Sequence, residues 1–126
     1  MTENIQNIGF EYITDWVFKD DRVKPASLDW EEISGWIYAF VTEDKIRYIG
    51  MTETVLRTRL DQYSYQKNKQ HPDTSDRVRG YIQECLDQDI TVNIYGLEQP
   101  EKSKPEIEAL ETELINKFDP DWNRKK

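Results

Sequence analysis

Two apolar segments separated by a short polar turn form the clearest pattern in the chain. Residues 36–41 are an unbroken apolar run rich in aromatic and β-branched side chains, which is typical of a buried strand. Residues 42–45 are polar, and residues 46–50 are again mostly apolar. This pattern predicts a β-hairpin.

The segments that follow the hairpin predict two helices. Apolar residues recur at helical spacing between 56 and 63, and Thr52 or Thr54 is the expected N-cap. Residues 64–74 are polar and contain a proline, which indicates a loop. A second helix is expected over residues 75–87, because the apolar residues there again form one stripe.

The last part of the chain predicts a third strand and a last helix. Residues 90–95 alternate between apolar and polar side chains, and residues 96–104 are expected to form a loop. Pro105 stands where proline favours the start of a helix, and that helix should end near Phe118, before Pro120. The resulting β-β-α-α-β-α order predicts an α+β fold, with a small, three-stranded, mostly antiparallel sheet flanked by helices.

The first 34 residues form a separate acidic lead-in that carries aromatic side chains. Within it, residues 8–18 are expected to form a strand that places Phe10, Tyr12 and Trp16 on one side. Residues 19–25 are typical of a turn. Residues 28–33 suggest one short helical turn.

At 126 residues, the chain fits a single domain. We expect the lead-in, 1–34, to pack on a core formed by residues 35–126.

Glu111 is the most unusual residue of the last predicted helix. A helical projection at about 100° per residue places it on the same face as Ile107, Leu114 and Phe118. Burying an unpaired carboxylate is costly, so Glu111 should pair with a buried arginine, reach solvent at the edge of the apolar stripe, or act as a metal ligand or catalytic carboxylate. The residues alone leave these interpretations open.

Arg59 lies beside the apolar stripe of the helix after the hairpin. It could form a salt bridge with Glu111, or its stem could cover apolar surface. Alternatively, its planar, forked guanidinium could bind a phosphate group.

Tyr38 and Tyr48 lie on the two strands of the predicted hairpin. They share one face of the sheet if the turn holds an odd number of residues, and they lie on opposite faces if it is a simple two-residue turn. The sequence leaves this parity open, and ordinary packing is the alternative role for two strand tyrosines.

Taken together, these residues resemble the motifs of the GIY-YIG nuclease family. Residues 36–38 (WIY), nine further residues and then residues 48–50 (YIG) are similar to the motif that names the family. Arg59 and Tyr63 match its R-x-x-x-(Y/H) pattern, and residues 111–123 are similar to its closing E-x-x-L-I-x-x-(F/Y)-x-P-x-x-N pattern. The resemblance covers nearly the whole chain after the lead-in.

The resemblance implies a role for each of these residues. Tyr38 would be the general base for the attacking water, and Arg59 would neutralise the scissile phosphate. Glu111 would hold one divalent ion, Mg²⁺ or Mn²⁺, which would polarise the phosphate. The supporting residues, which would hydrogen-bond around the phosphate and water or fix the site from the C-terminal end, are Tyr48, Tyr63 and Asn123.

Several positions depart from the family pattern. Trp36 stands where glycine is usual, Met51 stands where many members have lysine, and Arg59 comes one residue later than in the commonest spacing. His71 lies in the polar loop before Pro72 and is expected to be inert.

Charge complicates a nucleic-acid interpretation, because the formal net charge is −8. The segment 57–82 is the exception, since it carries six basic and three acidic residues. It is locally +3, which leaves −11 on the rest of the chain. We expect weak, salt-sensitive DNA binding through this segment.

The remaining composition bears on the compartment. The single cysteine, Cys85, permits no internal disulfide, and no apolar run is long enough to span a membrane. We therefore expect a cytoplasmic protein without membrane association.

The sequence thus predicts a metal-dependent endonuclease that hydrolyses DNA phosphodiester bonds. One alternative is a nucleic-acid-binding module of the same fold with weak or no catalysis. Another is an acidic protein, such as an immunity protein or DNA mimic, that binds a basic partner. A homodimer or a partner protein is a possible source of specificity, because so short a chain leaves little room for a second domain.

Overall fold

The computed structural model describes residues 2–27, 34–64 and 74–123. The short helical turn expected at 28–33 and most of the loop expected at 64–74 lie outside these ranges. The elements, in chain order, are α1 (Thr2–Asn7), β1 (Glu11–Lys19), β2 (Arg22–Pro25), β3 (Ser34–Thr42), β4 (Lys45–Val55), α2 (Leu56–Asp61), α3 (Thr74–Asp87), β5 (Val92–Glu98), α4 (Lys104–Phe118) and the 3-10 turn η1 (Asp121–Asn123).

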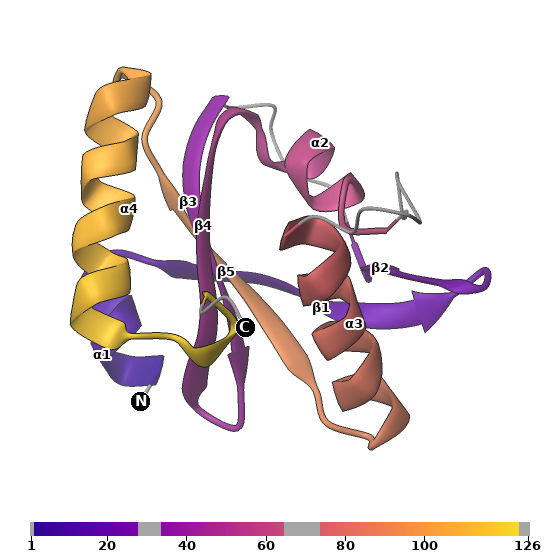
Figure 1. Ribbon diagram of the computed structural model, residues 1–126. Coiled ribbons are helices and arrows are strands. Elements are labelled where there is room, and N and C mark those ends of the chain that lie inside the picture. The colour runs from indigo at the N-terminus through magenta and orange to yellow at the C-terminus, as the bar shows by residue number, and fades with distance from the viewer. Residues whose placement is uncertain (1, 28–33, 65–73, 124–126) are drawn as a thin grey trace.

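A five-stranded antiparallel sheet in the order β2-β1-β5-β3-β4 forms the centre of the molecule. Helix α4, with α1, covers one face, and α2 and α3 cover the other (Figure 1). Each face buries its own apolar cluster, as the layer rules for small domains require. The α+β class and the β-β-α-α-β-α order after the lead-in are confirmed. The prediction of three strands was wrong, because the sheet has five.

The two additional strands come from the lead-in. Residues 19–25 are not a simple turn. They form a tight hairpin around Asp20 and Asp21, both with positive φ, and the edge strand β2. The prediction that Phe10, Tyr12 and Trp16 share one side was also wrong. Trp16 is buried among α2 and α3, Phe10 joins the cluster under α4, and Tyr12 is 51% exposed.

A β-bulge decides the parity of the hairpin tyrosines. Strands β3 and β4 join through a two-residue turn with positive φ at both positions, which alone would place Tyr38 and Tyr48 on opposite faces. The register shifts by one residue between Phe40 and Val41, so that Phe40 pairs with Tyr48 and Tyr38 pairs with Gly50. Both tyrosines therefore point into the cluster under α2 and α3.

The helix boundaries also differ from expectation in one place. Strand β4 runs to Val55, so neither Thr52 nor Thr54 caps α2, and the N-cap residue makes no side-chain cap. Helix α4 begins as predicted near Pro105, with a capping box between Ser103 and Glu106. It ends before Pro120. No helix in the described ranges is long and apolar enough to cross a membrane.

Candidate active site

Three tyrosine hydroxyls meet on the sheet face that α2 and α3 cover. The Oη atoms of Tyr38 and Tyr63 are 2.7 Å apart, and Tyr63 donates a longer hydrogen bond of 3.4 Å to Tyr48. Tyr38 comes from β3, Tyr48 from β4, and Tyr63 lies two residues after the end of α2. All three rings are buried and pack against Phe40, which makes the cluster rigid.

Arg59 binds two of these hydroxyls. Its Nε donates to Tyr38 Oη at 3.0 Å and its Nη2 donates to Tyr63 Oη at 3.1 Å. The guanidinium also lies 4.7 Å from the centre of the Tyr63 ring. Because Arg59 and Tyr63 are four residues apart, they lie on the same side of one helical turn. The sequence-predicted residues Tyr38, Tyr48, Arg59 and Tyr63 therefore form one contiguous group.

Two further residues hold the guanidinium, and the sequence analysis missed both. Arg59 Nη1 donates to Gln62 Oε1 and, at 3.3 Å, to Ser75 Oγ. The Gln62 contact has a local signal, since the residue lies three positions after Arg59 in the same turn. Ser75 belongs to α3, and the sequence holds no signal for this non-local contact.

Glycine at position 50 leaves space for the Tyr38 ring. A Cβ atom at Gly50 would lie 2.5 Å from both Cζ and Oη of Tyr38. The Tyr38 hydroxyl lies directly over the backbone of Gly50, so a side chain at position 50 would occupy the same space.

Burial controls the acid–base behaviour of the cluster. The loss of hydration raises the pKa of Tyr38 above its ordinary value, and the neighbouring Tyr48 adds to this, while Arg59 and Tyr63 oppose it. Burial likewise raises the pKa of Tyr63, with Tyr38 and Tyr48 adding to the effect. Both phenols are therefore neutral at neutral pH.

Glu111 lies at the middle of α4 and is half-buried, as the helical projection predicted. Burial raises its pKa, the charge of Glu108 raises it further, and Arg59 lowers it. The possible ion pair with Arg59 is not formed. Within the described residues, Glu111 makes no hydrogen bond or ion pair, although it is near enough to Arg59 for their charges to interact.

Two solved structures share this fold over nearly the whole chain. A glutamate-to-alanine variant of bacteriophage T4 EndoII matches with a TM-score of 0.79 and 22% identity, covering 98% of each chain. The restriction endonuclease Hpy188I, in complex with product DNA, matches with a TM-score of 0.58 and 16% identity, covering 99% of this chain and 82% of the other. Both are GIY-YIG nucleases. This chain has the GIY-YIG nuclease fold. No protein-family model and no curated protein sequence matches it.

Asn123 ties the end of the chain to the GIY-YIG hairpin. Its Oδ1 accepts from Ile49 N–H at 2.9 Å, and its Nδ2 donates to Ile49 C=O at 2.8 Å. Ile49 stands between Tyr48 and Gly50 on the edge strand β4, so the amide satisfies edge groups beside the tyrosine cluster. Asn123 thus bonds to the backbone of β4 beside the site, and these two hydrogen bonds do not involve the tyrosine hydroxyls.

The other residues singled out in the sequence have different surroundings. Trp36 is buried over Gly96, and Met51 is half-buried on the α4 side of the sheet. In the basic segment, Arg79 pairs with Asp76 at 3.1 Å and Arg77 donates to the Trp122 carbonyl at 2.9 Å. Arg57 is exposed. His71, Lys67 and Lys69 lie outside the described residues.

Proposed function

We propose that this protein is a metal-dependent endonuclease that hydrolyses DNA phosphodiester bonds. The arrangement of Arg59 carries the proposal. Its guanidinium is held by neutral acceptors only, and no carboxylate pairs with it among the described residues. A fixed, half-buried cation whose described neighbours include no paired carboxylate is suited to a phosphate group.

Glu111 is the residue that would hold Mg²⁺ or Mn²⁺. A half-buried carboxylate without a hydrogen-bond partner in the described ranges, and with a raised pKa, gains from a bound cation. No group of three or more His, Cys, Asp or Glu side chains could form a closed metal site in the described ranges. This suits Mg²⁺, which is often held by one or two carboxylates together with substrate phosphate oxygens and water. When bound, the ion would polarise the phosphate and stabilise the leaving oxygen.

Tyr38 is our candidate for the group that takes a proton from the attacking water. In its phenolate form, Tyr38 Oη would take one proton from the water, and the water oxygen would form the new bond to phosphorus. The bond from phosphorus to the sugar oxygen would break, and that oxygen would leave as an alkoxide that takes a proton from solvent. Arg59 fixes that hydroxyl in place and stabilises negative charge both on it and on the phosphate. Tyr63 and Tyr48 keep the hydroxyl within a hydrogen-bonded chain.

Because the pKa of Tyr38 is raised, we expect the rate of DNA cleavage to depend on pH. Below its pKa, the phenolate fraction grows tenfold per pH unit, so we expect the cleavage rate to rise about tenfold per pH unit, or about 10²-fold between about pH 7 and 9. Single-turnover rates on supercoiled plasmid would measure the slope. A rate that is level across this range would remove Tyr38 from the role of base.

DNA binding is proposed to use residues 57–82. Within this segment, Arg77 and Arg79 bond to Trp122 and Asp76, and the guanidinium of Arg59 is held beside the tyrosine hydroxyls without a carboxylate partner among the described residues. We expect weak binding that falls steeply with salt, with specificity supplied by a homodimer or by a partner protein.

The decisive experiment is cleavage of supercoiled and branched DNA at low salt with Mg²⁺ or Mn²⁺. We expect the wild-type protein to nick DNA and Glu111→Gln to be slower by about 10²-fold or more, because the amide preserves shape but holds a divalent ion poorly. Glu113→Gln is the matched control, since Glu113 is exposed on the same helix, and it should cleave like wild type.

Binding assays separate the alternatives. Wild-type protein that shifts DNA in a gel but never cleaves it would indicate a binding module of the same fold. Protein that neither binds nor cleaves would favour the acidic partner-binding alternative.

A further inference from the structure

Acidic side chains concentrate at turns of this protein. The non-glycine residues with positive φ in the described ranges are all acidic: Asp20, Asp21, Glu43, Asp44, Asp89 and Asp119. The β3–β4 turn and the C-terminal end of α3 both lie at the end of the molecule away from α2 (Figure 1). Glu43, Asp44 and Asp89 therefore lie at that end of the molecule, with Lys45 beside the first two.

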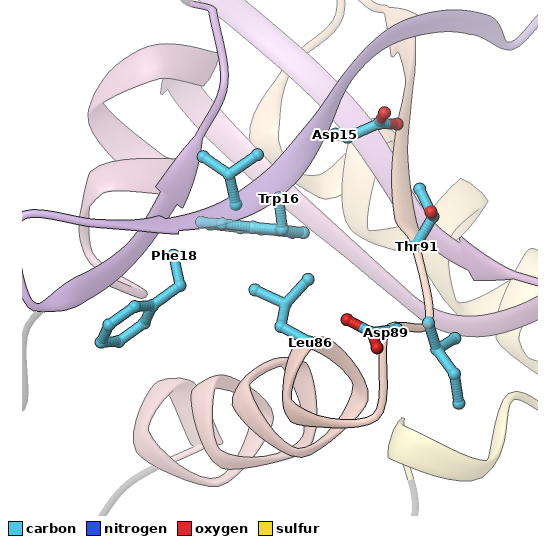
Figure 2. Close-up of a pocket in the computed structure, with 8 residues that line it drawn as sticks. Asp15, Trp16, Phe18, Leu86, Asp89 and Thr91 are labelled. Carbon is cyan, nitrogen blue, oxygen red and sulfur yellow. The ribbon is translucent and has the colours of Figure 1, made fainter.

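A groove of about 380 Å³ opens beside the C-terminal end of α3. Figure 2 shows the apolar side chains of Trp16, Phe18 and Leu86, with the carboxylate of Asp89 next to Leu86 and with Thr91 and Asp15 farther away. Phe18 is 51% exposed, which is unusual for so large an apolar side chain. The groove therefore combines an apolar surface with neighbouring polar groups.

The charged side chains that line the groove, in the described part of the chain, are both acidic. Asp15 and Asp89 are the only ionisable residues among those that line it. Asp15 Oδ1 accepts from Tyr12 Oη at 2.9 Å and from Asn93 Nδ2 at 2.7 Å, so the carboxylate is held in place. Asp89 is exposed and has no side-chain bond within the described part of the chain. The negative end of the α3 dipole adds to their field.

The end of α3 does not require a carboxylate at position 89. Ile90 N–H donates to Cys85 C=O at 2.8 Å, and Asp89 has a φ of 60°, which together form a left-handed helix cap. Glycine adopts this conformation at lower cost than aspartate. Helix termination alone therefore does not account for the charge at the groove.

We propose that this groove docks a segment of a partner protein in which an arginine or lysine stands beside an apolar side chain. The cation would lie beside Asp89, with Asp15 on the opposite face of β1 adding attraction at longer range, and the apolar side chain would cover Leu86 and Phe18. Charge complementarity selects such a segment and disfavours nucleic acid, whose phosphates the two carboxylates repel. The inference goes beyond the proposed endonuclease activity and does not depend on it.

A nuclear magnetic resonance titration tests the proposal. The probe is a blocked Leu-Arg-Leu peptide, and its control is the same peptide with citrulline, which keeps the arginine shape without the charge. We expect the arginine peptide to shift the amides of residues 86–91 and the Trp16 indole N–H, and to bind about fivefold more tightly than the citrulline peptide.

Two variants assign that preference to the groove. Asp89→Asn keeps a side chain that tolerates positive φ, and it should remove most of the preference for arginine. Asp87→Asn is the matched control, because Asp87 is an exposed acid nearby that does not line the groove, and it should preserve the preference.

Each other outcome overturns the proposal. Equal binding of both peptides, equal loss in both variants or the absence of localised shifts would show that no cation site exists there. Shifts of the same resonances that grow with protein concentration alone would make a second copy the occupant. None of these measurements uses DNA cleavage, so their outcomes are independent of the endonuclease test.

Discussion

Replacing Arg59 with alanine is expected to reduce DNA cleavage by about 10³-fold, and replacing it with lysine by about 10²-fold. The guanidinium makes hydrogen bonds to Tyr38 and Tyr63 with two different nitrogen atoms. Lysine keeps the positive charge, but its single ammonium cannot hold both hydroxyls and face a phosphate in the same geometry. The measurement is the single-turnover rate on supercoiled DNA at saturating divalent metal.

Arg57→Lys is the control for this pair, because Arg57 is exposed on the same helix two residues earlier. It should leave the cleavage rate within about twofold of wild type while weakening DNA affinity only slightly. Circular dichroism would show that the Arg59 variants are folded at the assay temperature. Cleavage by Arg59→Lys at the wild-type rate would refute the proposed role of the guanidinium fork.

Local sequence patterns predicted the residues whose geometry depends on one element. The position of Glu111 on the inward face of α4 follows from helical spacing alone. The same holds for Arg59 and Tyr63, which are one helical turn apart. In each case, the spacing along the chain already determines which side chains share a face.

Contacts that depend on strand register could not be predicted in this way. The shared face of Tyr38 and Tyr48 exists because the register shifts by one residue after Phe40, and no local residue pattern marks that bulge. A second shift, between Tyr12 and Thr14, breaks the period of two that placed three lead-in aromatics on one side. A one-residue change in register exchanges the faces of every side chain beyond it.

Contacts between residues far apart in sequence explain the remaining errors. Strand β1 pairs with β5, more than 70 residues away, so no local signal showed that the lead-in enters the sheet. The contact of Ser75 with Arg59 does not involve strand pairing, but it is also non-local, because it joins α3 to α2. The lead-in therefore completes the sheet that positions the site, although its own sequence carries none of the family motifs.

Replacing Gly50 with alanine is expected to impair both stability and cleavage. The new methyl group would lie 2.5 Å from the hydroxyl end of Tyr38, and that ring cannot move freely because it is buried and bonded to Arg59 and Tyr63. We expect a loss of about 1–3 kcal/mol in the free energy of unfolding. We also expect the cleavage rate to fall by about 10²-fold, because a displacement near 1 Å is enough to disturb such a site.

A double-mutant cycle separates the clash from general effects of the substitution. In a Tyr38→Ala background the added methyl group would meet no ring, so Gly50→Ala should cost little there and the coupling free energy should be about 1–3 kcal/mol. Urea unfolding would measure all four proteins. Gly80→Ala is the control, since nothing lies within 4 Å of a Cβ atom on that helical glycine. It should stabilise the protein by about 0.5–1 kcal/mol.

Equal destabilisation by Gly50→Ala with and without the Tyr38 ring would refute the proposed contact. A coupling confined to the pair would instead link a motif glycine to the position of one hydroxyl group. The glycine and the tyrosine are twelve residues apart in sequence but directly paired across β3 and β4. The residue types at both positions would then be required by the same physical constraint, which is the space that one buried phenol needs to reach Arg59.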